Sequence, residues 1–307
     1  MFGEFLNRIS SAFTTKIISS LDNILVGLRT ISENFSTLMK FLMDTHEEPE
    51  DLVCDYENND EEKIYSGFSV RINDYITIRQ PSVDEIIKYG ANQYYGMVYT
   101  LCSVGADLKW QLDDMGKDYM EVDDFELFYS VLARGFNVDK TKILFGNKID
   151  FSQMQVMYNK EIDAPVMIQL LDNGELIQID KYTYSCIVGT LRKIHRLKRN
   201  DETPGNEATK QILIEDAREE YEQNIGKPQK PYLLPLISTL VTSFGGNRDA
   251  VLSLNIYAFV DAVARLGKIK NADLLLSSGY SGFGIDLKKI NKEETNWMGS
   301  GSAEKVV

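Results

Sequence analysis

The sequence predicts an α+β protein with a mainly helical body, small antiparallel β-hairpins and an N-terminal coiled-coil-like helix. Three observations lead to this fold class. Apolar residues repeat every seven positions near the N-terminus, two segments alternate between apolar and polar residues around turn residues, and the C-terminal half has helical spacing. The chain has 307 residues and is 43% hydrophobic, which is enough to bury an ordinary globular core.

Residues 1–43 are predicted to form one amphipathic helix. Within it, the apolar residues at the two core positions of a heptad are Leu21, Ile24, Leu28, Ile31, Phe35, Leu38 and Leu42. A seam of about three heptads is the shortest that favours a coiled coil, so we expect these residues to mediate self-association or partner binding. Two alternatives stay open. The helix docks on its own domain, or it lies at a membrane interface, for which it carries few positive charges.

Residues 44–64 are predicted to be an acidic linker. Between residues 44 and 63 the sequence has ten Asp or Glu residues and one Lys. The low apolar content cannot compensate for the entropy that is lost on ordering. We therefore expect a tether that joins the N-terminal helix to an α+β main domain at 65–298, followed by a flexible Gly/Ser-containing tail at 299–307.

Two hairpins are predicted in the main domain. Residues 68–72 and 75–80 alternate on either side of an Asn-Asp pair, which suits a two-residue turn. Residues 165–171 and 175–180 flank an Asp-Asn-Gly turn in the same way. Residues 151–158 are compatible with either a helix or a strand.

The helices are predicted from their start and stop signals. Ser82 and Glu85 have capping-box spacing, which predicts a helix start after Ser82 and an interruption at Gly90. The next helix, at 92–102, carries clustered tyrosines. We expect them in the core rather than as a platform for nucleic-acid bases, because no basic residues lie beside them. Further helices are predicted at 106–115, 125–133, 182–197, 206–224, 232–244 and 254–276.

Charge and composition exclude several classes of function. The net charge is -13 and the pI is near 4.8, so nucleic acid is an unfavourable partner. The only histidines are His46 and His195, so a Cys/His zinc site is not expected, and no cofactor is predicted. The chain has no run of 18 apolar residues, and its start lacks the apolar centre of a signal peptide. We therefore expect a soluble, intracellular protein without membrane contact.

No catalytic motif is complete. Residues 147–150 read Asn-Lys-Ile-Asp, as in the guanine-reading sequence of GTPases, but the chain has no phosphate-binding loop. The glycines at 279–284 are in the wrong order for a phosphate cradle or a nucleophile elbow. No set of nucleophile, base and orienting residue can be recognised. The sequence therefore predicts a protein that is not an enzyme.

One dense basic run occurs at 192–199. Its cationic residues are Arg192, Lys193, Arg196, Lys198 and Arg199. They are expected near the C-terminal end of a helix, where the macrodipole favours positive charge. This possible basic patch supports an alternative function, a nucleic-acid or regulatory binding module. The competing interpretation is a solvated helix end that pairs with the acidic helix residues at 215–222.

Several short strings occur together: Ile78-Arg79-Gln80-Pro81, Glu85-Ile86-Ile87, Tyr89-Gly90, Gln111-Leu112, Met115-Gly116, Asp118-Tyr119, Leu144-Phe145-Gly146, Leu191-Arg192-Lys193 with His195, and Asn296-Trp297-Met298. Over residues 65–298 the chain thereby resembles proteins encoded in the tail-gene region of phages and prophages of Gram-positive bacteria, some of which look like tail assembly chaperones. The strings are structural signals, so no functional residue is transferred.

The resemblance implies a non-enzymatic virion component or tail assembly chaperone. Such a protein would bind other phage tail or head proteins. It would be found in the host bacterial cytoplasm during assembly, or in the virion. With the heptads and the absent catalytic set, this gives the functional expectation of a phage structural or assembly protein that acts through protein–protein contacts.

Overall fold

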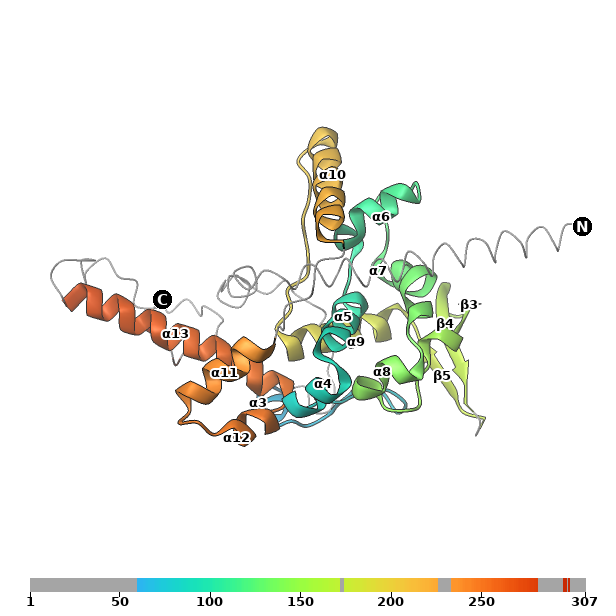
Figure 1. The fold of residues 1–307 in the computed structure, drawn as a ribbon. Coiled ribbons are helices and arrows are strands. Elements are labelled where there is room, and N and C mark those ends of the chain that lie inside the picture. The colour runs from blue at the N-terminus through green and yellow to red at the C-terminus, as the bar shows by residue number, and fades with distance from the viewer. Residues whose placement is uncertain (1–59, 172–173, 226–232, 281–294, 297, 299–307) are drawn as a thin grey trace, which may run out of the picture.

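The structure is a computed structural model that describes residues 60–171, 174–225, 233–280, 295–296 and 298. This part of the chain is mainly helical and contains one two-stranded and one three-stranded antiparallel sheet, which confirms the α+β class. The predicted N-terminal helix with its heptad residues, the linker up to residue 59 and the tail lie outside the described residues. Figure 1 shows α5 and α9 at the centre of the body, with the three-stranded sheet at one end.

The described part opens with α3 (Glu61–Tyr65), whose first four residues fall within the predicted linker. Asp60 caps this helix, because its carboxylate accepts a hydrogen bond from the Lys63 backbone N–H at 2.8 Å. Ile64 is fully buried, and the Gln80 side-chain amide donates to its carbonyl oxygen. The folded domain therefore includes Asp60 and does not begin at residue 65.

The first hairpin is confirmed, but its strands are short and its predicted two-residue turn is wrong. Strand β1 (Val70–Arg71) pairs with β2 (Thr77–Ile78) in antiparallel register. The turn also takes in Tyr75, because the Asn73 side-chain oxygen accepts hydrogen bonds from the backbone N–H groups of Tyr75 and Ile76. An asparagine that bonds to the backbone ahead of it stabilises such a turn.

The capping box is confirmed at the start of α4 (Val83–Tyr89). The Ser82 hydroxyl accepts from the Glu85 N–H, and the Glu85 carboxylate accepts from the Ser82 N–H. Gly90 separates α4 from α5 (Ala91–Leu101) with a φ of 107°, a conformation that favours glycine. Tyr94 and Tyr95 on α5 are buried, as expected for core aromatics.

The segment from residue 105 to 145 consists of short helical pieces. They are η1 (Gly105–Leu108), α6 (Lys109–Asp114), α7 (Asp124–Leu127), a π-helical turn η2 (Phe128–Leu132), η3 (Ala133–Gly135) and α8 (Val138–Phe145). Gly116, with a φ of 69°, follows the end of α6, and the Asp123 carboxylate caps α7. The helix signals indicate neither the π turn nor α8.

The three-stranded sheet follows a short 3-10 turn η4 (Phe151–Gln153). It consists of β3 (Gln155–Asn159), β4 (Ala164–Leu170) and β5 (Leu176–Ile179), in the order β3-β4-β5. The second predicted hairpin is therefore confirmed as β4–β5. The ambiguous segment at 151–158 supplies the third strand, with Val156 opposite Met167, which in turn lies opposite Ile179.

The C-terminal half is helical, as predicted. It contains α9 (Lys181–His195), α10 (Glu207–Asn224), α11 (Leu233–Ser243), α12 (Arg248–Ser253) and α13 (Ile256–Tyr280). The sequence did not indicate α12, which begins after an Asn247 cap. In Figure 1, α10 projects from the body beside α6, and α13 extends from the opposite side to the sheet. No helix in the described ranges is long and apolar enough to cross a membrane.

Candidate functional site

The basic run lies at the C-terminal end of α9, and its first arginine is buried. Arg192 is only 7% exposed, and its guanidinium Nη2 donates to the Cys102 carbonyl oxygen at 2.8 Å. Cys102 is the C-cap residue of α5, so its carbonyl has no partner further along that helix. Arg192 thus joins the ends of α5 and α9 from inside the protein.

His195 is buried beside Arg192 and is held at both ring nitrogens. Its Nδ1 lies 2.7 Å from the Leu191 carbonyl oxygen, and its Nε2 lies 2.6 Å from the Tyr94 hydroxyl. Because a carbonyl oxygen only accepts, Nδ1 carries the proton and Nε2 accepts from Tyr94. Burial lowers the pKa of His195 to about 4. This histidine is therefore neutral at physiological pH and packs as part of the core.

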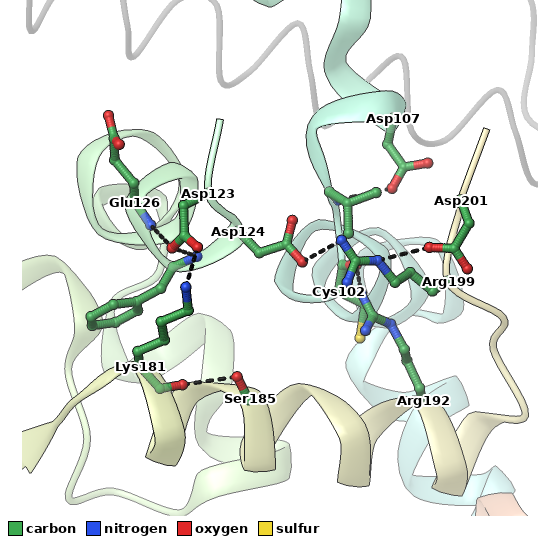
Figure 2. A network of polar contacts seen from close by, with 12 residues as sticks. Cys102, Asp107, Asp123, Asp124, Glu126, Lys181, Ser185, Arg192, Arg199 and Asp201 are labelled. Atoms are coloured by element: carbon green, nitrogen blue, oxygen red, sulfur yellow. Dashed lines mark hydrogen bonds and ion pairs between the residues drawn. The ribbon is translucent and has the colours of Figure 1, made fainter. Parts of the chain in front are cut away.

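Arg199 and its neighbours bind the chain after α9 to two other elements. The Arg199 guanidinium lies 2.9 Å from the Asp124 carboxylate and 3.0 Å from that of Asp201. Next to it, Asp107 accepts from the Asn200 side-chain amide at 2.8 Å. Figure 2 shows Asp107, Asp124 and Asp201 around the two guanidinium groups of Arg192 and Arg199.

Burial raises the pKa of both inner carboxyl groups of this network. For Asp107 the main cause is desolvation, which its bonds to the Val104 N–H and Asn200 and the charge of Arg192 oppose. Desolvation is also the main cause of the raised pKa of Asp124, and the positive charges of Arg199 and Arg192 oppose it. The arginines are thus counter-charges that oppose the rise in the pKa of these two buried carboxyl groups.

Arg196 ends α9 in the left-handed conformation, with φ at 52°. This conformation is unfavourable for a residue other than glycine. It directs the guanidinium to the Asp261 carboxylate on α13 and places it over the Tyr257 ring, 5.4 Å from the ring centroid. Arg265 approaches the same carboxylate at 3.3 Å. Arg196 therefore anchors α9 to α13.

Two of the run's arginines do not pair with the acidic helix, contrary to one sequence interpretation. Arg196 bonds to α13, and Arg199 bonds to α7 and to Asp201. Helix α10 contributes an arginine of its own to an ion pair, since Arg218 lies 2.8 Å from Asp114 on α6. Lys193 and Lys198 also have interactions within the protein. The end of α9 is thus a polar junction, defined here as Arg192, His195, Arg196 and Arg199 with their partners.

The polar junction has no chemistry of its own that indicates catalysis. Its histidine is buried and neutral, and each arginine is occupied by a carbonyl or carboxylate. Across the described ranges, no group of three or more His, Cys, Asp or Glu side chains could hold a metal ion. We interpret the junction as a structural element that fixes α5, α7, α9 and α13 relative to one another.

A second surface, which sequence reasoning missed, is the outer edge of the three-stranded sheet. On β3 the side chains of Val156, Met157 and Tyr158 are 47%, 52% and 60% exposed. Three further exposed apolar residues, Ile162, Leu170 and Leu176, lie on or beside the same sheet. Within the part of the chain that the structure describes, no strand pairs with the outer side of β3, and Figure 1 shows β3 as the outermost strand.

We call β3, Gln155–Asn159, the sheet edge. It contains no charged residue, although natural proteins commonly protect a free edge strand with charge or proline. Exposed apolar residues gather here and not on α5, where Tyr94, Tyr95 and Met97 are buried. The sequence feature that could have indicated this edge strand is the uncharged Val-Met-Tyr run, which comes one residue before a charged turn. The segment has no clear periodicity.

Comparison with known proteins adds no relative. No protein-family model, curated protein or solved structure matches the chain. The resemblance to phage tail-gene proteins therefore stays a prediction. The polar junction and the sheet edge are therefore the features of the described residues that bear on function.

Proposed function

We propose that this chain is a non-enzymatic structural or assembly protein that acts through protein–protein contacts made at the sheet edge. The observation that carries the proposal is the exposure of Val156, Met157 and Tyr158 on an edge strand without charge. An edge strand offers unpaired backbone N–H and C=O groups, and a partner strand gains hydrogen bonds and apolar contacts there. The resemblance supplies the setting, which is the assembly of phage tails or heads in the bacterial host.

The absence of an enzymatic role is part of this proposal. The best-organised polar groups of the described residues are occupied in the polar junction, where both ring nitrogens of His195 have hydrogen-bond partners. A general base must reach a substrate proton to act. The polar junction therefore supports stability, and the sheet edge supports binding.

Co-expression with tail and head proteins encoded beside this chain tests the proposal. We expect at least one of them to co-purify with the full-length protein. A Val156→Lys, Tyr158→Lys double variant is expected to lose about tenfold in affinity, because two cations would enter an apolar contact. Ile212→Lys is the matched control, since Ile212 is 55% exposed on α10, away from the sheet. Equal binding by all three proteins, or by none, would contradict the proposal.

One observation favours the alternative function of a nucleic-acid or regulatory binding module. Arg196, Arg265 and Lys268 gather near the single carboxylate of Asp261, and burial together with these arginines lowers the pKa of Lys268. Such a local excess of cations attracts phosphate. A gel shift at low salt that Lys198→Glu with Lys268→Glu abolishes would support this function. No shift at low salt would exclude it.

A further inference from the structure

We propose that two copies of this chain associate through their sheet edges, with β3 of one copy antiparallel to β3 of the other across a twofold axis at Met157. The two three-stranded sheets would then form one continuous sheet. This inference rests on the proposed function, because it names the partner of the same surface. It differs from the association predicted for the N-terminal heptads, since it involves only described residues.

The order of residues in β3 is self-complementary in this register. With Met157 opposite itself, Val156 lies opposite Tyr158 of the other copy, and Gln155 lies opposite Asn159. Opposite residues in an antiparallel pair have Cβ atoms about 4.5–5.5 Å apart, and aromatic–β-branched pairs are among the favourable ones. The amide side chains at the two ends of the strand can bond to each other.

The two faces of the sheet agree with this arrangement. Paired residues point to the same face, so Val156 shares its face with Met167 and Ile179, which are 1% and 0% exposed. Val156 and Tyr158 thus extend the buried side of the sheet toward its open edge. A second copy would continue this apolar layer and cover both side chains. On the opposite face, the two Met157 side chains would meet at the axis.

Charge favours a second copy at this position. The chain carries a net charge of -13, so most contacts between two copies would be repulsive. The sheet edge has no charge from Gln155 to Asn159, and the next residue, Lys160, would lie opposite the uncharged Met154. No pair of like charges therefore lies opposite across the strand pair. A symmetric contact of this kind closes after two copies and does not propagate into fibres.

The contact is small, which sets the expected affinity. Two five-residue strands bury less surface than a permanent dimer interface. We therefore expect a dimer that dissociates in the range of about 1–100 μM. Tyr158 is prearranged for the contact, because its hydroxyl donates to Asp163 in the following turn. The side chain thereby loses less freedom on binding.

The test uses the full-length protein and two variants with opposite charges at the axis. Met157→Lys and Met157→Glu each place like charges opposite one another in a dimer, so each is expected to raise the dissociation constant about tenfold. Mixing the two variants places a cation opposite an anion. The mixture is therefore expected to form heterodimers as tightly as the wild type, as measured by sedimentation velocity over a concentration series.

Recovery of association in the mixture distinguishes self-pairing in this register from every other occupant of the edge. Ile212→Lys is again the control and should dimerise like the wild type. The proposal is overturned if the wild type remains a monomer, if Met157→Lys associates as tightly as the wild type, or if the mixture does not recover. If these results occur while neighbouring tail proteins still bind the sheet edge, the proposed function holds and only the self-pairing fails.

Discussion

The polar junction at the end of α9 and the sheet edge use side chains in opposite ways. The junction takes charged residues, which usually face water, into the protein and satisfies them, as with Arg192 on the Cys102 carbonyl. The sheet edge leaves apolar residues, which usually lie in the core, facing outward, as with Met157. Both regions depart from the usual pattern of exposed charged residues and buried apolar residues. Within the described residues, only the buried charges of the polar junction have partners that offset the cost of burial.

This difference indicates which region serves the fold and which serves a partner. A buried charged side chain whose hydrogen bonds are made within the protein has a structural role, because it connects the elements that carry its partners. An exposed apolar edge has no such internal explanation and marks a surface for association. Under the proposed function, the basic run serves the fold and the uncharged strand serves binding.

The largest effect is expected from Arg192→Ala, which would test the structural role of the polar junction. The substitution leaves the buried Cys102 carbonyl without this donor and removes a counter-charge of Asp107 and Asp124. We expect a loss of about 3 kcal/mol in the free energy of unfolding, measured by chemical denaturation. Arg71→Ala, at an exposed pair with Asp74, should cost at most about 1 kcal/mol. Similar losses of stability in both variants would contradict the structural role of the polar junction.

A pH-dependent effect of similar size is expected from His195. Its pKa is about 4 in the folded state and 6.5 in the reference state, so below pH 6.5 the unfolded chain binds a proton that the folded one does not. Stability is therefore fully present above pH 6.5 and falls by up to about 3 kcal/mol on going to pH 4. The measurement is the difference between wild type and His195→Gln in denaturation from pH 4 to 7, because carboxylates contribute equally to both.

A smaller effect is expected at the capping box of α4. Ser82→Ala removes the acceptor of the Glu85 N–H and should lower the free energy of unfolding by about 1 kcal/mol. Ser238→Ala, at an exposed position inside α11, is the control and should change it by less than about 0.5 kcal/mol. Thermal or chemical denaturation distinguishes the two. Equal stability of Ser82→Ala and wild type would show that this cap does not stabilise the domain.

The smallest effect on stability is expected at the sheet edge. Met157→Lys changes a side chain that is 52% exposed and should alter the free energy of unfolding of the monomer by less than about 0.5 kcal/mol. The same substitution is nevertheless expected to weaken self-association about tenfold, because the side chain contacts the second copy and not the core. A large loss of stability would instead place Met157 in the core.

Local signals in the sequence predict much of the fold. The capping box at Ser82, the stop at Gly116 and the β4–β5 hairpin depend on residues that lie close together in the chain, so reading the sequence in order finds them. The turn after β1 was predicted too short because the Asn73 side chain bonds ahead to two backbone N–H groups. The start of α13 is fixed by contacts with Pro81, far away in sequence.

The two candidate sites could not be placed from the sequence for the same reason. The partners of His195 and Arg192 in the polar junction are Tyr94 and Cys102, from a helix about a hundred positions earlier in the chain. Their burial is decided by this distant packing, which helical periodicity does not encode. The strand character of β3 likewise comes from pairing with β4, because its own apolar pattern has no clear period.

Hydrogen–deuterium exchange on the full-length protein across a concentration series tests whether the sheet edge binds a second copy while the polar junction acts within one chain. We expect backbone amides at 155–159 to become protected as concentration rises from about 1 to 100 μM, and Met157→Lys to shift this protection to about tenfold higher concentration. Amides at 192–199 should be equally protected at every concentration, because their environment is internal to one chain. Concentration-independent exchange at the sheet edge, or concentration-dependent protection at the polar junction, would contradict the account.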